Sequence, residues 1–425
     1  MKFFSIFKSP LFSNSLWMIS EKIISIFGLI FVTSFVAKYI GPENFGKLTL
    51  AISLFAVIQT IAMFGSENVI FQKTSKNFKT GIKLILAARK IRNSLYFVFS
   101  PILLVYLYYS VDMLTFVFAV SSCIATFFAL HDVFNIYFNA VLDSKINALC
   151  NVIGMVVSLV IRYLIVILSL DASYLAIPII ALTLLPFLLR RYIFYKIIKD
   201  KKIIINQDFG KYTRYMVGVG RKLVLYSLSV AIFTKTSQIF LGWHSTYDLG
   251  IYTVAVTLGT SFYFVLLALI TSFMTDIYKE NSYNESQKKV ARLNLMVLVV
   301  SFLAFIFFYI FGNYVINMLY GEKFSSANSI LLLMVVVCMF SGLSTVAEKY
   351  LIKFNAYSYL QKKTNILVIF NIVITFFSVK YFGLYGAVLS ILFTELFSTT
   401  LFNYFYGNKV IIDTHKRIFL PSTYR

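Results

Sequence analysis

Twelve apolar segments, each close to the length of a bilayer-spanning helix, constrain the fold of this chain more than any other feature. A bilayer core requires about 20 apolar residues per helix. All twelve should be α-helices, because lipid offers no partner to open backbone groups. With 59% hydrophobic and 13% charged residues, the chain has too few polar side chains to cover a soluble fold. The segments lie at about 14–38, 47–71, 93–110, 113–142, 148–170, 172–196, 214–243, 249–278, 293–312, 326–350, 364–380 and 384–406.

The basic residues between these segments predict the orientation of the chain in the membrane. With the N-terminus in the cytoplasm, 32 of the 39 lysines and arginines fall on the cytoplasmic side and four on the opposite side. The other three lie within helices. Positive charge gathers on the cytoplasmic side of membrane proteins, so we expect both termini in the cytoplasm. The same distribution accounts for the net charge of +22, and no nucleic-acid partner is expected.

A short motif occurs twice in the chain. Asn44-Phe-Gly-Lys-Leu-Thr-Leu-Ala-Ile52 returns as Asp248-Leu-Gly-Ile-Tyr-Thr-Val-Ala-Val256, with Gly46 and Gly250 in register. Each copy covers the start of an apolar segment, so the pattern indicates two homologous bundles. A polar stretch divides the segments into six and six. Because each half has an even number of helices, both bundles have the same orientation, and the repeat is a parallel pseudo-twofold one. The expected domains are an N-terminal six-helix bundle (1–197), a cytoplasmic linker (198–213), a C-terminal six-helix bundle (214–412) and a cytoplasmic tail (413–425).

Charged residues inside the helices are the candidates for function. Each costs roughly 2.5–3.5 kcal/mol at the centre of a bilayer, so each should face the bundle interior or a water-filled cavity. Lys22, Arg162 and Lys235 are the candidate substrate-binding cations of such a cavity. A second set of residues is acidic and either couples transport to an ion or forms structural pairs. Its members are Glu395, Asp132 and Glu67.

Polar stripes at helical spacing suggest which helices line the cavity. The stripes contain Ser25, Thr60, Gln238 and Thr257, on the first, second, seventh and eighth segments. Small and hydroxyl residues at this spacing also let membrane helices pack. Cavity lining and helix packing therefore both stay open as interpretations of the stripes. The sequence has no Gly-rich phosphate loop and no His, Cys or carboxylate cluster with metal-ligand spacing. Neither a catalytic site, a cofactor nor a metal is therefore expected, and the short outer loops leave no room for a catalytic domain.

Val36-Ala-Lys-Tyr-Ile-Gly-Pro-Glu-Asn-Phe-Gly46 resembles the Ala-Arg-x-Leu-Gly-Pro-Glu-x-Phe-Gly turn of the O-antigen flippases. These form the Wzx-type, polysaccharide-transport branch of the MOP superfamily, which is MATE-like in fold. Three weaker matches follow in the family's order. They are Leu249-Gly-Ile-Tyr-Thr-Val-Ala255, Asn317-Met-Leu-Tyr-Gly-Glu322 and Phe382-Gly-Leu-Tyr-Gly-Ala387. Glu395 matches an acidic residue often found in the last helix, whereas Lys38 replaces the usual Arg. The assignment of the cavity cations follows from the cost of placing a charge inside a membrane helix and not from this match.

The resemblance implies a transporter of the bacterial inner membrane and not an enzyme. Its substrate would be an undecaprenyl-pyrophosphate-linked oligosaccharide repeat unit, moved to the periplasmic leaflet by alternating access. Implied partners are this lipid-linked oligosaccharide, membrane lipid, H⁺ or Na⁺ as a coupling ion, and the polymerase and chain-length proteins of the same pathway.

Two other functions fit the length and hydropathy of the chain. One is a multidrug or cation antiporter of the MATE branch, although the mid-membrane cations count against it. The other is an O-antigen polymerase-type enzyme, against which the short outer loops count. Which glycan is carried, O-antigen, capsule or another, stays open.

Overall fold

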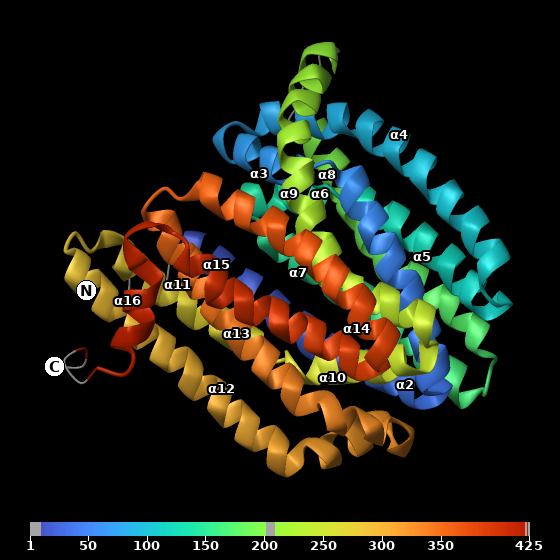
Figure 1. The fold of residues 1–425 in the computed structure, drawn as a ribbon. Helices are drawn as coiled ribbons and strands as arrows, with labels where there is room; N and C mark the ends of the chain where they lie inside the picture. The colour runs from blue at the N-terminus through green and yellow to red at the C-terminus, as the bar shows by residue number, and fades with distance from the viewer. Residues whose placement is uncertain (1–9, 201–208, 421–422, 424–425) are drawn as a thin grey trace. The chain divides into compact units, whose positions relative to one another are not determined.

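The computed structural model describes residues 10–200, 209–420 and 423, and the elements found there are helical (Figure 1). The N-terminal elements are α2 (Pro10–Met63), α3 (Ser66–Lys76), α4 (Phe78–Ser110), α5 (Met113–His131), α6 (Phe134–Ala140), α7 (Ser144–Ile167), η1 (Ala172–Leu175) and α8 (Ala176–Asp200). After α9 (Phe209–His244) come α10 (Thr246–Gly259), α11 (Tyr263–Lys279), α12 (Tyr283–Tyr320), η2 (Glu322–Ala327), α13 (Asn328–Lys353), α14 (Tyr357–Thr399), α15 (Leu401–Tyr404), η3 (Gly407–Lys409) and α16 (Val410–Arg417).

Within the described residues, nine helical stretches are long and apolar enough to cross a membrane. The twelve expected segments are consistent with this number, because two of the helices each contain two segments. α2 runs through Gly41, where the backbone leaves helical geometry at φ 76° and ψ 173°. α14 does the same at Gly383, with φ 52° and ψ −123°. The seventh segment falls on α9, which is not among the nine.

The chain forms two compact units. Unit 1 contains Met1–Ile40 and Lys47–Ala231, and unit 2 contains Gly41–Gly46 and Ile232–Arg425. The boundary between Ala231 and Ile232 therefore lies inside α9. The interval 198–213, expected as a linker, falls within unit 1, and its residues 201–208 lie outside the described part of the chain.

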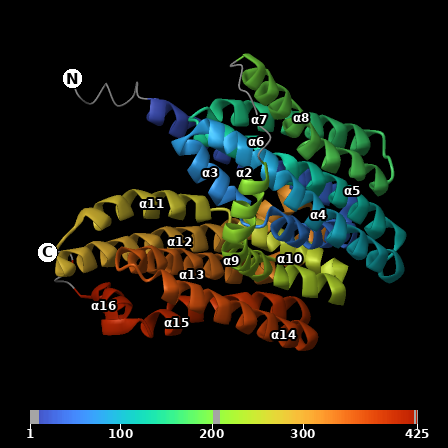
Figure 2. The same ribbon diagram turned by 90° about the horizontal axis from the view of Figure 1, so that it is seen from above.

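Unit 1 is held together by α8, which packs against both α5 and α7, while α3 packs on α4 and α6. α7 and α8 run side by side in both ribbon views (Figure 2). Large aromatic side chains fill the space between α6 and α8. Phe134 and Phe194 have ring centroids 4.8 Å apart, and Tyr137 meets Phe194 edge to face at 4.9 Å. Such pairs contribute packing beyond the apolar area that they bury.

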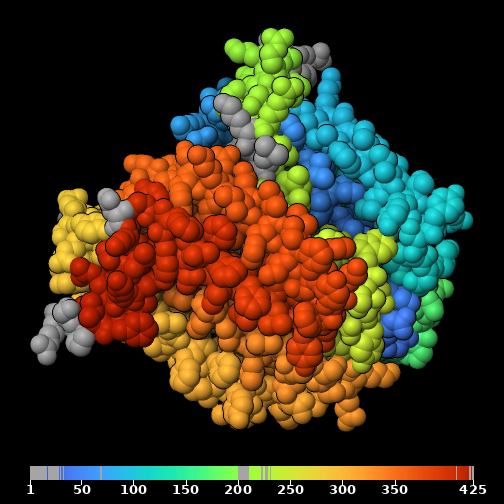
Figure 3. Space-filling model, in the orientation of Figure 1, coloured from blue at the N-terminus to red at the C-terminus, as the bar shows by residue number. Residues whose placement is uncertain are grey.

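Unit 2 is built on α13, which contacts α10, α11, α12 and α14. α13 and α14 lie side by side (Figures 1 and 2), and α14 covers much of the face of unit 2 seen in Figure 3. The core between α11, α12 and α13 contains Leu266, Ile270, Val297 and Val346, all without measurable exposure. The two stretches of α14 that flank Gly383 meet through buried polar groups, with Asn371 donating to Thr394 at 3.2 Å.

The segment Gly41–Gly46 packs against the start of α10 within unit 2. A Cβ on Gly46 would overlap the carbonyl of Thr246, and a Cβ on Gly250 would overlap the carbonyl of Pro42. Phe45 is buried, with its ring 6.1 Å from that of Phe324. The aligned glycines of the repeated motif are therefore in mutual contact, and glycine is required at both because two backbones meet there.

Candidate functional site

Arg162 of α7 is buried in unit 1 without a carboxylate partner among the described residues. Its exposed fraction is 6%. Its Nε donates to Ser158 Oγ at 3.3 Å, and that hydroxyl donates to the carbonyl of Pro178 at 3.0 Å. One neutral hydroxyl does not neutralise a guanidinium, so Arg162 keeps a charge that an anion could balance.

Lys235 and Gln238 of α9 are in direct contact in unit 2. The Lys235 Nζ donates to Gln238 Oε1 at 2.9 Å. No carboxylate in the described part of the chain lies within ion-pair distance of Lys235. The spacing of three residues places both side chains on one face of the helix, and the amide fixes the position of the ammonium while leaving its charge intact.

Asp132 forms a buried ion pair with Arg190 in unit 1. The Arg190 Nε lies 3.0 and 2.9 Å from the two carboxylate oxygens, and its Nη2 also donates to Asp132. The Nη1 of Arg190 donates to Asn151 Oδ1 at 2.8 Å and to the carbonyl of Asn147 at 3.4 Å. Of the two readings left open for Asp132, ion coupling or structural pairing, this geometry favours structural pairing.

Glu395 of α14 has no basic residue within ion-pair distance among the described residues of unit 2. Ser341 and the more distant charges of Glu348 and Lys363 are the groups that act on its carboxyl. Lys363 is itself buried, with its Nζ 3.1 Å from Glu348 Oε1 and 2.9 Å from Asn403 Oδ1. Glu395 therefore lies beside an ion pair without belonging to it.

The remaining candidates divide into three cases. Glu67 is exposed at the start of α3. The Thr60 hydroxyl donates to the Ala56 carbonyl at 3.0 Å and the Thr257 hydroxyl to the Thr253 carbonyl at 2.7 Å, as hydroxyls in membrane helices commonly do. Lys22 and Ser25 belong to α2, but their side chains lie outside the described part of the chain. A shared cavity lined by these residues stays a prediction.

Three buried cations were not singled out from the sequence. Arg92 and Lys363 lie just before an apolar segment and Arg190 lies in the last part of one, so the distribution of basic residues places all three on the cytoplasmic side. Arg190 and Lys363 have acidic partners, whereas Arg92 is 2% exposed and has none among the described residues. The sequence could not have identified them, because their polar neighbours, such as Asp132 beside Arg190, belong to other segments and the sequence alone does not show which segments meet.

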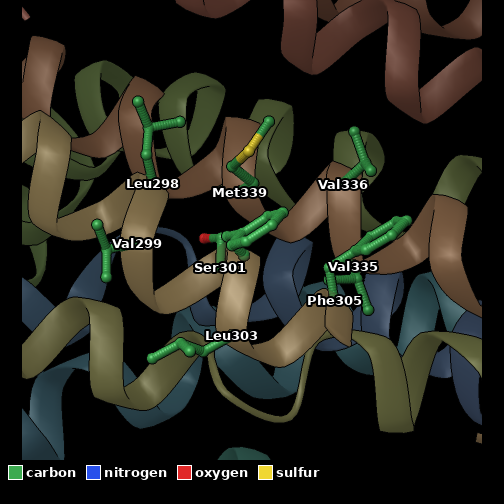
Figure 4. Close-up of a pocket in the computed structure, with 9 residues that line it drawn as sticks. Leu298, Val299, Ser301, Leu303, Phe305, Val335, Val336 and Met339 are labelled. Carbon is green, nitrogen blue, oxygen red and sulfur yellow. The ribbon is translucent and has the colours of Figure 1, made fainter. Parts of the chain in front are cut away.

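A groove of 550 Å³ between α12 and α13 is the wrong kind of site for a charged group (Figure 4). Leu298, Phe305, Val335 and Met339 are among its lining residues, and Ser301 is the polar one. A lining of this kind fits hydrocarbon. A charged head group would find neither a counter-charge nor sufficient hydrogen bonds there.

A family model described as polysaccharide biosynthesis protein matches residues 35–329, more than half of the chain. The chain belongs to this family. The match begins at the turn motif and extends through η2. No curated protein matches the chain.

Solved structures of the MOP superfamily resemble the whole chain. The lipid II flippase MurJ in an inward closed conformation is 14% identical, with a TM-score of 0.70 over 95% of this chain and 90% of that one. An inward-facing multidrug resistance MATE family transporter of the MOP superfamily is 15% identical, with a TM-score of 0.68 over 91% and 94%. MATE in a bent conformation is 14% identical, with a TM-score of 0.57 over 98% and 97%.

These likenesses establish the fold. The prediction of an all-α, multi-pass membrane fold of the MATE-like type is confirmed, and so is the resemblance to the polysaccharide branch of the MOP superfamily.

Proposed function

We propose that the protein is a flippase that moves undecaprenyl-pyrophosphate-linked oligosaccharide repeat units from the cytoplasmic to the periplasmic leaflet of the bacterial inner membrane. The observation that carries the proposal is the family match over residues 35–329 in a chain with the fold of MurJ and MATE. A polysaccharide family with a transporter fold favours transport of a glycan precursor over its synthesis or polymerisation.

The buried cations supply a physical reason for this substrate. A pyrophosphate group carries negative charge across a medium of low dielectric constant, where it needs counter-charges. Arg162 and Lys235 each have a neutral hydrogen-bond partner and no carboxylate in the described part of the chain. The lipid tail of the substrate can stay in the bilayer while the head group crosses by alternating access.

Glu395 is the first candidate for coupling to an H⁺ or Na⁺ gradient. It lies within a membrane-spanning stretch of α14 and has no ion pair among the described residues. Asp132 suits this role less, because its carboxylate is already paired with Arg190. A carboxyl group that binds and releases a proton or Na⁺ during transport must have a low free-energy cost in both the bound and the free state.

Two variants test the proposal in proteoliposomes that contain a fluorescent undecaprenyl-pyrophosphate-linked oligosaccharide and a membrane-impermeant quencher. Arg162→Ala and Lys235→Ala should each slow translocation by about tenfold or more, the loss expected from one charge-assisted contact. Arg214→Ala and Lys323→Ala remove exposed cations from α9 and η2 and should leave the rate unchanged. Equal rates in all four variants would remove these cations from the mechanism.

Deletion of the gene in its native strain tests the substrate class. We expect loss of surface glycan and accumulation of single lipid-linked repeat units on the cytoplasmic face. Normal surface glycan with altered drug tolerance would contradict the proposal and indicate an antiporter. Single-repeat glycan on the finished surface lipid would contradict it in another way, by showing intact flipping and lost polymerisation.

A further inference from the structure

Unit 1 contains a small pocket with a buried arginine that has no acidic partner among the described residues, and we call it the arginine pocket. Its volume is 130 Å³, and its lining includes Arg89, Arg92, His131, Phe187, Arg191 and Tyr195. α4, α5 and α8 supply these residues. The volume suits one compact group and not a drug-sized ligand, whose pockets hold roughly 300–1,000 Å³.

Arg92 has hydrogen-bond donors that nothing in the described part of unit 1 accepts. Its side chain is 2% exposed. Nη2 donates to the carbonyl of Ile85 at 3.3 Å, while Nε and Nη1 are buried without a partner. A buried guanidinium with two unused donors is costly unless an anion occupies the adjoining space.

Among the residues that the structure describes, no carboxylate lines the pocket to balance this charge. Asp132 follows His131 in sequence, but Arg190 holds it through both carboxylate oxygens. His131 contacts the Phe127 carbonyl at 2.7 Å and Asn93 Oδ1 at 2.5 Å. An imidazole is neutral or positive, so His131 cannot balance the charge of Arg92. The charged side chain that acts on Arg92 is another cation, Arg89.

A third arginine lines the pocket on its exposed side. The Arg191 guanidinium lies 5.8 Å from the ring centroids of both Phe187 and Tyr195. A cation–π contact of this kind attracts the guanidinium to the rings and leaves its donors available. A shallow groove continues from Arg191 and Tyr195 along α8 to Lys196 and Lys199.

The place of the pocket along its helices suggests the depth of the ligand. α4 has 33 residues and is about 50 Å long, whereas the hydrocarbon core is about 30 Å thick. Arg89 and Arg92 lie in the first half of α4, next to the basic stretch that begins at Lys73, and Arg191 lies toward the end of α8. Basic pockets between helices at the cytoplasmic head-group level bind anionic lipid head groups.

We propose that the arginine pocket binds the phosphate group of a membrane lipid, with Arg92 as the buried ligand and Arg89 and Arg191 as the outer ligands. The planar forks of arginine match phosphate oxygens in pairs, and the aromatic walls accommodate the adjoining apolar part of the lipid. The same chemistry occurs in anionic phospholipids and in polyprenyl phosphates. The site does not depend on the proposed flippase function.

The test uses the delipidated full-length protein in detergent, with lipid binding followed by native mass spectrometry. The probes are phosphatidylglycerol, undecaprenyl phosphate and, as an uncharged lipid, diacylglycerol. Wild-type protein should retain a phosphate lipid and not diacylglycerol. Arg92→Gln and Arg191→Gln should each weaken that binding by roughly tenfold or more. Lys90→Gln is the matched control, because Lys90 is exposed on α4 and does not line the pocket.

The outcomes separate the two lipid sources. Arginine-dependent binding of phosphatidylglycerol supports a structural or regulatory phospholipid, and preferential binding of undecaprenyl phosphate supports a carrier-lipid site. Equal binding to wild type and both arginine variants overturns the proposal, as does an equal loss in Lys90→Gln. Because Arg191 is exposed, its variant keeps the test valid if Arg92→Gln does not fold.

Discussion

The guanidinium of Arg190 is shared among an acidic side chain, an asparagine side chain and a backbone carbonyl. It connects Asp132 at the end of α5 with Asn147 and Asn151 on α7. Further amide contacts extend this group, since the Asn147 Nδ2 donates to Asn139 Oδ1 at 2.8 Å and to the Asn135 carbonyl at 2.9 Å. The polar centre of unit 1 is therefore a connected network, in which removal of one member leaves others unsatisfied.

Asp132→Asn should destabilise unit 1 by about 3–5 kcal/mol, because it leaves a buried arginine without its counter-charge. The thermal unfolding midpoint of the purified protein measures the effect, and the double variant Asp132→Asn/Arg190→Gln should recover part of the loss. Glu285→Gln removes an exposed partner of Lys288 and should change stability by less than about 1 kcal/mol. A stable Asp132→Asn protein that had lost transport would instead assign Asp132 to ion coupling.

His415 on α16 should make the C-terminal part of unit 2 sensitive to acid. Burial lowers its pKa to about 4 from the ordinary 6.5. Well above pH 6.5 the imidazole is neutral in both the folded and the unfolded form. As the pH falls below 6.5 the unfolded form binds a proton first, so stability decreases progressively until the folded pKa is reached.

The expected loss from His415 is at most about 3 kcal/mol between pH 6.5 and 4. Unfolding midpoints measured across this range should fall more steeply for wild type than for His415→Asn, which can still contact the Tyr404 hydroxyl now 2.9 Å from Nδ1. Identical pH slopes for the two proteins would show that another group controls acid stability.

Sequence patterns could not identify these pairs. Asp132 and Arg190 are 58 residues apart, and no periodicity relates them. Lys235 and Gln238 were predictable together only because they share one face of α9. Arg92 falls outside the third apolar segment because hydropathy defines where a segment ends but not how far its helix continues, and α4 begins 15 residues before that segment.

At the scale of elements, the breaks in α2 and α14 have related causes. Both occur at a glycine with positive φ that connects two apolar segments. At each break a second glycine follows within five residues, at Gly46 and Gly386, where a Cβ would overlap a backbone carbonyl. The turn motifs were recognisable in the sequence, but their packing was not, because Gly46 contacts a residue some 200 positions away.

Gly46→Ala and Gly250→Ala should each destabilise the protein by about 1–3 kcal/mol, because a methyl group would push the two backbones apart. Gly210→Ala is the control. Gly210 lies in α9 with nothing within 4 Å of its Cβ position, so alanine should be neutral or slightly stabilising there. Unfolding midpoints decide between these expectations, and an unaffected Gly46→Ala protein would show that the contact can relax without cost.

At the scale of the whole molecule, hydropathy was sufficient for the fold class because lipid permits few alternatives to helices.

The orientation of the chain in the membrane is still a prediction, because it rests on the distribution of basic residues alone. Asp171→Cys should react with an impermeant maleimide in intact cells, and Asn281→Cys only after permeabilisation. Both positions are exposed, and the three native cysteines should first be replaced. Labelling in the reverse order would invert the proposed topology.

The division of the chain at Ala231 has a consequence for how the two units are linked. The chain passes between the units after Ile40, after Gly46 and after Ala231, and each passage lies within α2 or α9. A protease cut within 201–208 would sever the polypeptide between two parts of unit 1 and leave all three passages covalently intact. The nicked protein should thus migrate as one particle under native conditions, so that co-purification of its two fragments says nothing about the affinity of one half of the sequence for the other.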